Sequence, residues 1–191
     1  MKWTTLLCAG LACAAVSAAA GDQPQPLALN RQLIAHWKFD EAIGAFCRDT
    51  SGKDCHAAAE HGVTALSRTT GVFGQALNFS GIHSLSCGER LKLGSQPKLA
   101  FSVWVLPAEF TEYNELFRKE DGDQRVLFSF QDKGRILSLG LNINGYIECD
   151  AKVDPARLLD GAWHHCAASF DGKFMRVFLD GREIGSLERP G

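Results

Sequence analysis

The chain has 191 residues, 46% of them hydrophobic, and a formal net charge of -2 at pH 7. This hydrophobic fraction is sufficient for a packed core, so the composition excludes a chain that is disordered throughout. The balanced charge, without a cluster of lysine and arginine, lacks the field that holds a phosphate backbone. Nucleic acid is therefore not an expected partner.

The N-terminus has the pattern of a secretory signal peptide. An apolar run at residues 6–16 follows a lysine, and the small residues Ala18 and Ala20 fit a cleavage site. The run is too short to span a bilayer. We therefore expect residues 1–20 to be removed and the mature protein to be secreted, either extracellular or periplasmic, and not membrane-spanning. The alternative is a lipoprotein acylated at Cys13.

The remaining chain is expected to form a polar linker over residues 21–32 and one domain over residues 33–191. Within the domain, β-branched and aromatic content or strict apolar–polar alternation predicts strands. These predicted strands cover residues 33–39, 76–79, 101–107, 125–130, 136–143 and 146–149. The segment 46–70 has the composition of a loop, and one helical turn is expected at 156–160.

The clearest local signal is a β-hairpin at residues 163–181. Asp171-Gly172 joins two apolar runs, and Asp180-Gly181 forms a second tight turn. Two-residue Asp-Gly loops favour type I′ turns, which match the twist of the flanking strands. Turn signals recur about every ten residues along the domain, which indicates an all-β sandwich or barrel.

Five cysteines follow the predicted signal peptide: Cys47, Cys55, Cys87, Cys149 and Cys166. An oxidising compartment permits disulfides, and an odd number leaves at least one thiol free or intermolecular. We expect Cys47–Cys55, which brackets a turn, and Cys149–Cys166, whose members both lie in predicted strands. The alternative for Cys149 and Cys166 is that both are buried small hydrophobic residues.

Several segments, taken in order, resemble laminin-G-like, concanavalin-A-like jelly-roll domains. They are WKFDE at 37–41, DTSG at 49–52, GQALNFSG at 74–81, FSVWV at 101–105, WHH at 163–165, FDG at 170–172 and VFLDG at 177–181. The resemblance implies an all-β fold of two stacked antiparallel sheets. It also implies a non-catalytic role in binding a glycan or an extracellular protein, usually beside other domains of a longer secreted chain.

The end of the sequence departs from that family. In the family the hairpin is followed by another strand or two that return toward the first strand, whereas this sequence ends with RPG at 189–191. We therefore expect a sandwich that lacks its last strand. Either the chain is a fragment of a longer product, or the exposed edge is covered in another way. An absent closing strand would leave a neighbouring strand with unpaired backbone groups.

Three acidic residues are candidate calcium ligands. Asp40, Glu41 and Asp49 lie near turns, where carboxylate and carbonyl oxygens suit a hard cation, and the resemblance implies structural calcium in some relatives. The alternative is that Asp49 caps its own turn and Asp40 ends a strand.

Other polar and aromatic residues have a mainly structural interpretation. Adjacent strand residues point to opposite faces, so we expect His164 and His165 to be packed and hydrogen-bonded and not to chelate one ion. Tryptophans within apolar strands are expected in the core. If the domain has a ligand surface, the exposed loops around Tyr113, Asn114 and residues 144–146 are the better candidates.

Catalysis is not expected. Glycoside hydrolases on this fold use two carboxylates on one sheet, and Glu148 and Asp150 share a face of a predicted strand. The third acid of the usual Glu-x-Asp-x-(x)-Glu pattern is missing. The expected function is a binding or adhesion module, with a structural spacer and, less favoured, a glycoside hydrolase as the alternatives.

Overall fold

The structure is a computed structural model of the chain that describes residues 4–6, 33–79, 84–88, 91, 93, 97–121 and 124–189. Its first strands are β1 (Thr4–Leu6), β2 (Phe46–Cys47), β3 (Ala57–Ala59), β4 (Ser67–Thr70), β5 (Gln75–Asn78), β6 (Leu85–Ser86) and β7 (Leu99–Leu106). Its later elements are β8 (Tyr113–Asp121), β9 (Gln124–Gln131), β10 (Ile136–Asn142), β11 (Tyr146–Lys152), α1 (Pro155–Leu158), β12 (His164–Phe170), β13 (Phe174–Leu179) and β14 (Arg182–Glu188).

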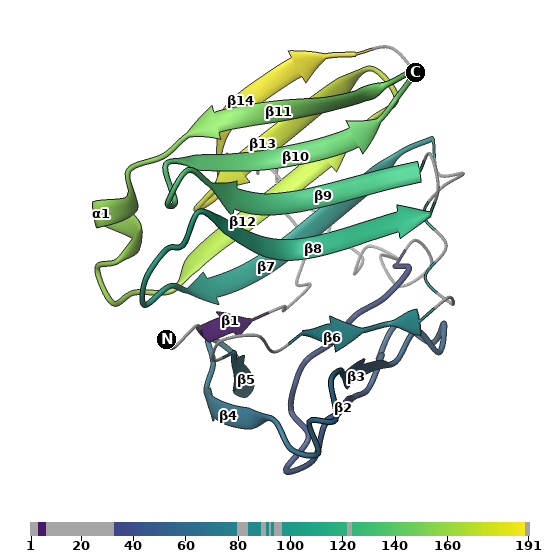
Figure 1. Cartoon of the computed structure of the whole chain (residues 1–191), viewed down its shortest axis with the longest axis vertical. Coiled ribbons are helices and arrows are strands. Elements are labelled where there is room, and N and C mark those ends of the chain that lie inside the picture. The colour runs from purple at the N-terminus through teal and green to yellow at the C-terminus, as the bar shows by residue number, and fades with distance from the viewer. Residues whose placement is uncertain are drawn as a thin grey trace, which may run out of the picture.

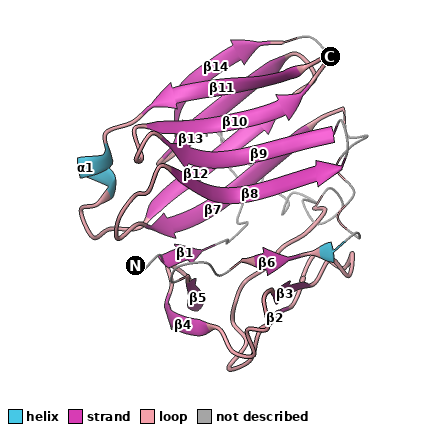
Figure 2. Ribbon diagram, viewed as in Figure 1, coloured by secondary structure: helices cyan, strands magenta, loops and turns pink. Residues whose placement is uncertain are grey.

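Two large antiparallel sheets form the body of the molecule. One has the order β1-β7-β12-β13-β14 and the other β11-β10-β9-β8. Figures 1 and 2 show them stacked face to face, with the smaller sheets β2-β3-β6 and β4-β5 beside them. The predicted all-β, two-sheet sandwich is therefore confirmed. Among the described residues, no helix is long and apolar enough to cross a membrane.

The core lies between the two large sheets and extends over the smaller ones. Alternation along each strand sends every second side chain inward, where it packs against the opposite sheet. The inward residues of the four-stranded sheet include Phe128, Phe130, Leu137 and Leu139, and those of the five-stranded sheet include Val103, Cys166, Met175 and Val177. All eight are 2% exposed or less, which is burial typical of a close-packed interior.

The predicted strands at 101–107, 125–130, 136–143 and 146–149 correspond to β7, β9, β10 and β11, and the helical turn corresponds to α1. Asp154 begins α1, because its side chain accepts a hydrogen bond from the backbone N–H of Ala156. The predicted hairpin at 163–181 is formed by β12 and β13. Clear apolar–polar alternation was therefore sufficient to predict the strands in this part of the chain.

The two Asp-Gly turns differ from each other. Asp180 and Gly181 have φ angles of 50° and 76°, as the expected type I′ turn requires. At Asp171-Gly172 only the glycine has a positive φ, so the prediction of a type I′ turn is wrong there. The Asp171 carboxylate instead accepts hydrogen bonds from the backbone N–H groups of Lys173 and Phe174, which stabilises a longer loop.

The prediction of a strand at 33–39 is also wrong. Only an isolated bridge between Trp37 and Asp49 is present in this segment. Phe39 has a φ of 61°, which interrupts an extended strand, and the backbone N–H of His36 donates to the side chain of Asp49. The segment 46–70, expected to be a loop, contains the short strands β2, β3 and β4.

Both ends of the chain contribute strands to the five-stranded sheet. Thr4–Leu6, within the predicted signal peptide, pairs with β7 as β1. The rest of residues 1–32, including the predicted cleavage site and linker, lies outside the described residues. After the Asp180-Gly181 turn, β14 pairs with β13 through a bulge at Val177 and Phe178. No strand was predicted from the sequence at the position of β14.

Arg189 connects the two large sheets beyond the end of β14. Its guanidinium donates hydrogen bonds of 3.0 to 3.2 Å to the carbonyl oxygens of Ile143 and Asn144, in the turn between β10 and β11. Asn144 and Gly145 both have positive φ in this turn, as the Asn-Gly pair predicts. Arg189 therefore holds the turn that leads into β11.

Candidate functional site

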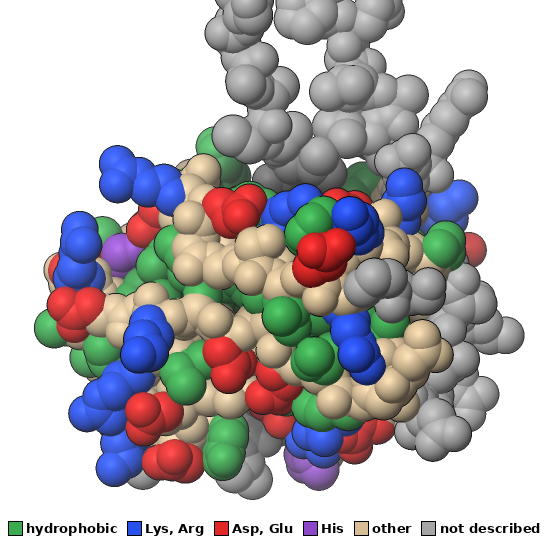
Figure 3. All heavy atoms as spheres, turned by 90° about the horizontal axis from the view of Figure 1, so that it is seen from above, with side chains coloured by type: hydrophobic (Ala, Val, Ile, Leu, Met, Phe, Trp, Pro, Cys, Tyr) green, Lys and Arg blue, Asp and Glu red, His purple; other side chains and the backbone are tan. Residues whose placement is uncertain are grey.

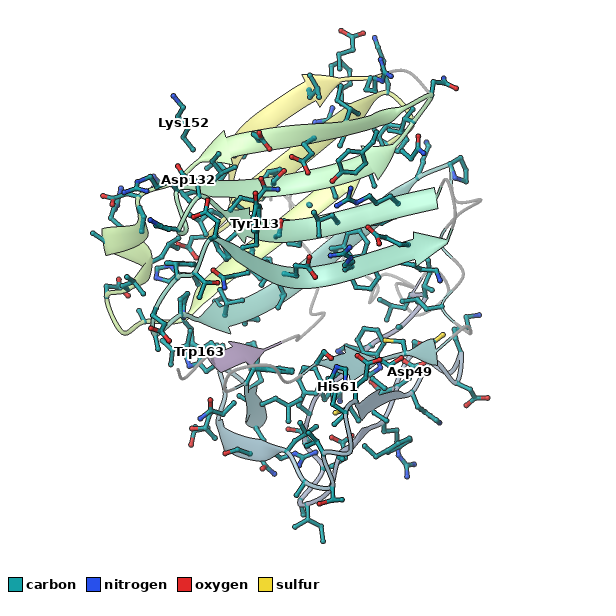
Figure 4. The ribbon with its side chains drawn as sticks, in the orientation of Figure 1. Asp49, His61, Tyr113, Asp132, Lys152 and Trp163 are labelled. Carbon is teal, nitrogen blue, oxygen red and sulfur yellow. The ribbon has the colours of Figure 1, made fainter. Side chains whose placement is uncertain are left out.

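The outer face of the four-stranded sheet carries the chain's main array of polar side chains. We use "outer face" for the side chains of β8–β11 that point away from the core: Tyr113, Glu115, Arg118, Glu120, Arg125, Leu127, Ser129, Gln131, Ile136, Ser138, Gly140, Asn142, Tyr146, Glu148, Asp150 and Lys152. The alternation that buries Phe128 and Leu139 places these residues on the opposite side. Figure 4 shows this sheet with its side chains, Tyr113 and Lys152 among them.

Register aligns the outer face in rows that cross all four strands. Glu115, Ser129, Ser138 and Asp150 form one such row. The Ser138 hydroxyl donates a 2.6 Å hydrogen bond to Asp150 Oδ1. Ser129 and Ser138 are buried beneath longer neighbouring side chains. The next row contains Arg118, Leu127, Gly140 and Glu148, and it has no side chain at Gly140.

Tyr146 lies over the gap that Gly140 leaves. A Cβ atom at Gly140 would collide with the Tyr146 hydroxyl. That hydroxyl donates a 2.5 Å hydrogen bond to Glu148 Oε1, and the Arg125 guanidinium lies 4.4 Å from the ring centroid. Burial and the hydrogen bond to Glu148 raise the pKa of Tyr146. The ring is therefore held in place, although 39% of the residue is exposed.

The acidic side chains of the outer face have different partners on β8–β9 and on β11. On β8 and β9, Arg118 contacts Glu115 at 2.8 Å and Glu120 at 2.9 Å, and Arg125 contacts Glu120 at 3.0 Å. The bond to Arg118 lowers the pKa of Glu120. These acids are therefore largely neutralised by arginine.

The two acids of β11 have neutral partners. Glu148 accepts hydrogen bonds from the hydroxyl of Tyr146 and, at 3.4 Å, from the side-chain amide of Gln131, and Asp150 accepts from Ser138. Within the described part of the chain, neither acid has a cation within ion-pair distance. On the face of the molecule seen from above, Figure 3 shows charged side chains of both signs mixed together.

The three predicted calcium ligands have other partners. Asp49 accepts hydrogen bonds from the backbone N–H groups of His36, Ser51 and Cys55 and from the Ser51 hydroxyl, at 2.7 to 3.0 Å. Burial raises the pKa of Asp49, but these hydrogen bonds outweigh burial and leave the pKa below its usual value. Asp49 is therefore the turn-capping residue of the alternative interpretation.

The other two acids are held apart by different contacts. Asp40 Oδ1 accepts from the backbone N–H of Gln75, and Glu41 accepts from that of Arg48 and lies 3.6 Å from Arg68. Throughout the residues that the structure describes, no three His, Cys, Asp or Glu side chains are placed to hold a metal ion. The predicted grouping of these carboxylates around calcium is thus not the arrangement observed, because each carboxylate stabilises a local turn or strand.

The histidine pair is packed and hydrogen-bonded, as predicted. His164 is buried, with its Nδ1 2.9 Å from Asp180 and its Nε2 3.3 Å from Asp160. His165 points to the other face, where its Nε2 lies 2.6 Å from the Ser102 hydroxyl. Burial lowers the pKa of His165. The two imidazole rings therefore lie on opposite faces of β12 and have different hydrogen-bond partners.

The two predicted disulfides are not formed, and the described residues contain no other disulfide. Cys47 pairs with Ala57, the first residue of β3, and Cys55 lies two residues before that strand. Cys149 contacts the carbonyl of Met175, whereas Cys166 pairs with Leu179. The two contact points on β13, Met175 and Leu179, are four residues apart, which is about 13 Å along a strand.

The thiols are instead buried small side chains, as the alternative for Cys149 and Cys166 proposed. Cys47, Cys149 and Cys166 are 2% exposed or less. Burial raises the pKa of Cys47 to about 12 and that of the half-buried Cys87 to about 11. Because the thiolate is the reactive form, these raised pKa values oppose oxidation.

The aromatic residues divide between core and surface. Trp37 is buried, and Trp104 and Trp163 pack against the core, as expected. Tyr113 is 65% exposed and Tyr146 39% exposed, in the region expected for a ligand surface. Tyr113 was expected on a loop and Tyr146 at the junction of a loop with the predicted strand 146–149, and both begin strands of the outer face. Gly140 and Arg125 were not expected at the site, because their relation to Tyr146 depends on strand register.

Comparisons with known proteins place this sandwich among related folds. The family model described as the concanavalin A-like lectin/glucanases superfamily (Laminin_G_3) matches residues 84–191. Among solved structures, the mouse laminin alpha1 chain, domains LG4-5, is similar at 14% identity with a TM-score of 0.38. That match covers 66% of this chain and 39% of the laminin chain, so this chain spans about two fifths of its length. A search of curated proteins finds no match.

The family match includes all four strands of the outer face, β8–β11. It covers more than half of the sequence, and the fold is the two-sheet sandwich that the family match implies. The chain therefore belongs to the concanavalin A-like lectin/glucanases superfamily, whose laminin-G-like members are generally binding or structural modules.

Proposed function

We propose that the chain is a secreted carbohydrate-binding module whose ligand lies on the outer face of the four-stranded sheet. The observation that carries this proposal is the anchored ring of Tyr146, which lies over Gly140 and is fixed by Glu148 and Arg125. An aromatic ring that is rigid and partly exposed offers apolar contact area at a low entropic cost.

The neighbouring side chains suit a polyhydroxylated ligand. Glu148 and Asp150 each have one carboxylate oxygen engaged by a hydroxyl group, and carboxylates retain further acceptor sites for the hydroxyl groups of a sugar. Gln131 adds an amide beside Glu148. Tyr113 is a second exposed ring, on β8 at the opposite end of the outer face from Tyr146. A few placed polar groups beside aromatic surface are the usual composition of a small-ligand site.

The proposed module is non-catalytic. Hydrolysis of a glycosidic bond needs one carboxylate as acid and a second as nucleophile or base. Glu148 and Asp150 are followed by Ala151, Lys152 and Val153, so the third acid of the Glu-x-Asp-x-(x)-Glu pattern is missing from this strand. The binding is also proposed to be independent of calcium, because Asp40, Glu41 and Asp49 support local structure.

Secretion is supported by the signal-like pattern of residues 1–20 and by the extracellular setting typical of laminin-G-like domains. Expression in a host with a secretory pathway, followed by mass determination of the exported protein, tests it. The proposal requires exported protein whose mass has decreased by that of the N-terminal segment. Retention of the full-length chain inside the cell would overturn this part of the proposal.

Glycan-array binding with and without EDTA tests the function. The wild-type protein should bind a set of glycans equally in both conditions, Tyr146→Ala should lose at least about 10-fold in affinity, and Phe73→Ala should bind as wild type. Phe73 is a matched control, because it is an aromatic residue 70% exposed in the turn between β4 and β5. Equal binding by Tyr146→Ala would contradict the site.

The other assignments predict different results. Binding to an extracellular protein with no glycan signal would favour protein recognition, and the absence of both would favour a structural spacer. Release of reducing sugar from any bound polysaccharide, lost in Glu148→Gln, would replace the non-catalytic assignment with a glycoside hydrolase.

A further inference from the structure

We propose that the outer face selects oligosaccharides that carry a positively charged amino group over those that carry carboxylate or sulfate groups. This inference rests on the proposed function and specifies the class of carbohydrate that the module binds. The basis is the uneven division of charge between the β8–β9 half and the β11 half of the outer face.

On β8 and β9 the charges compensate one another. Arg118 donates hydrogen bonds to both Glu115 and Glu120, and Arg125 forms an ion pair with Glu120 while its guanidinium lies over the Tyr146 ring. An anionic sugar that approached these arginines would compete with carboxylates that already occupy them. The guanidinium groups are therefore poor anchors for an acidic ligand.

On β11 the two acids of the outer face, Glu148 and Asp150, form no ion pair with any cation that the structure describes. Glu148 and Asp150 are two residues apart, so they share the outer face with their Cβ atoms about 7 Å apart. The described residues bond to each through neutral donors and on one oxygen, Oε1 of Glu148 and Oδ1 of Asp150. Lys152 lies on the same face but, in the described structure, makes no ion pair with Asp150.

The position of Tyr146 brings a ligand to these carboxylates. Its hydroxyl is 2.5 Å from Glu148, so a pyranose ring stacked on the tyrosine has its substituents beside Glu148, with Asp150 two residues farther along the same face of β11. An ammonium group there forms charge-assisted hydrogen bonds, whereas a carboxylate or sulfate is repelled. Each exposed ion pair is worth up to about fivefold in affinity, so two give a preference on the order of 10-fold.

Calorimetric titration of one backbone with three charges tests the inference. The probes are a chito-oligosaccharide in its deacetylated form, its N-acetylated neutral form, and its C6-oxidised, N-acetylated anionic form, at a pH where the sugar amine is charged. We expect the amino form to bind about 10-fold more tightly than the neutral form and the anionic form to bind most weakly. The preference should decrease at high salt, because exposed charges are screened.

Charge-removing variants locate the effect. The double variant Glu148→Gln/Asp150→Asn should bind the amino and neutral forms equally, and the introduced amide oxygen can still accept the hydrogen bond from Tyr146. Glu188→Gln removes one negative charge from an exposed position on β14, in the other sheet, and should keep the full preference. Circular dichroism of each variant confirms folding, and the wild-type comparison of three ligands tests the inference without any variant.

The outcomes separate the two proposals. Equal or tighter binding of the neutral or anionic form would overturn the charge preference and leave carbohydrate binding intact. No binding of these probes, together with no signal on the glycan array, would overturn both. Binding of oligolysine that equals binding of the amino sugar and persists in Tyr146→Ala would also overturn the inference, since charge alone would then explain the result.

Discussion

The turn that contains Asp49 and the β11 strand that contains Glu148 and Asp150 are both acidic, but they use their carboxylates differently. Asp49 accepts from three backbone N–H groups and a hydroxyl. Glu148 and Asp150 accept only from side chains. A turn leaves backbone N–H groups for a carboxylate to satisfy, whereas a sheet pairs them in its ladder. Carboxylates on the outer face of this sheet therefore keep acceptor sites for a ligand.

Removal of the Asp49 carboxylate should give the largest effect on stability. Asp49→Ala leaves the backbone N–H groups of His36, Ser51 and Cys55 without their acceptor. Hydrogen bonds to a charged group contribute about 1.5–3 kcal/mol each but are not additive, so we expect a loss of about 3 kcal/mol in the free energy of unfolding. Chemical denaturation measures it. Asp49→Asn, which keeps an acceptor oxygen, should lose less.

The same residue predicts a response to acid. The folded-state pKa of Asp49 is below its ordinary value of 3.8, so its contribution is fully present above that value and is lost as the pH falls through the folded pKa. Denaturation curves between neutral pH and about pH 3 should show a smaller acid-induced loss in Asp49→Ala than in wild type. An equal loss in both proteins would contradict the role of Asp49.

The acidic turn and the outer face also differ in how far sequence predicts them. The turn DTSG is a local pattern, and the alternative in which Asp49 caps it followed from four consecutive residues. The contact of Gly140 with Tyr146 joins two strands, and its geometry depends on a register that composition does not encode. Local chemistry was predictable, and cross-strand chemistry was not.

The same distinction explains the errors in the fold. β9 and β10 alternate cleanly and were predicted, whereas residues 33–39 have strand composition but are bent at Phe39. Sequence proximity suggested the Cys47–Cys55 disulfide, but the strand partner of Cys47 is Ala57 and not Cys55. The predictions failed where they depended on which strands pair and in which register, because the sequence alone does not specify either.

A methyl group at Gly140 should disturb the outer face without unfolding it. Gly140→Ala places a Cβ against the Tyr146 hydroxyl, which is the mobile end of a side chain, and Gly140 has no positive φ that only glycine tolerates. We expect glycan affinity to fall about 10-fold and the free energy of unfolding to change by less than about 1 kcal/mol. Calorimetric titration and denaturation measure the two quantities.

A double-mutant cycle tests the route of this effect. If Gly140→Ala acts by displacing Tyr146, then Gly140→Ala/Tyr146→Ala should bind no more weakly than Tyr146→Ala alone. Additive losses would mean that Gly140 affects binding independently of the ring, and would contradict the anchored-ring interpretation.

Loss of Arg189 should have a smaller effect. Arg189→Ala removes hydrogen bonds to the carbonyl oxygens of Ile143 and Asn144, at the turn that precedes Tyr146. Because the site is near the surface, we expect a loss of about 1 kcal/mol in the free energy of unfolding and faster hydrogen exchange at Gly145. Arg189→Lys, which keeps the charge but not the forked geometry, should be intermediate. Unchanged exchange in Arg189→Ala would contradict the connection.

The smallest perturbation is ionisation of the Tyr146 hydroxyl itself. The sequence has two tyrosines, so Tyr113→Phe leaves Tyr146 as the only tyrosine. Burial and the hydrogen bond to Glu148 raise the pKa of Tyr146, so tyrosinate absorbance should develop well above the ordinary value of about 10. The stabilisation from this hydroxyl is present below that value and is lost as pH rises through the folded pKa. In the added background of Glu148→Gln the midpoint should move back toward 10, because the neutral amide no longer opposes formation of the phenolate. A midpoint near 10 without that substitution would mean that Tyr146 is not held against Glu148. The outer face would then lack the anchored ring on which the proposed ligand site depends.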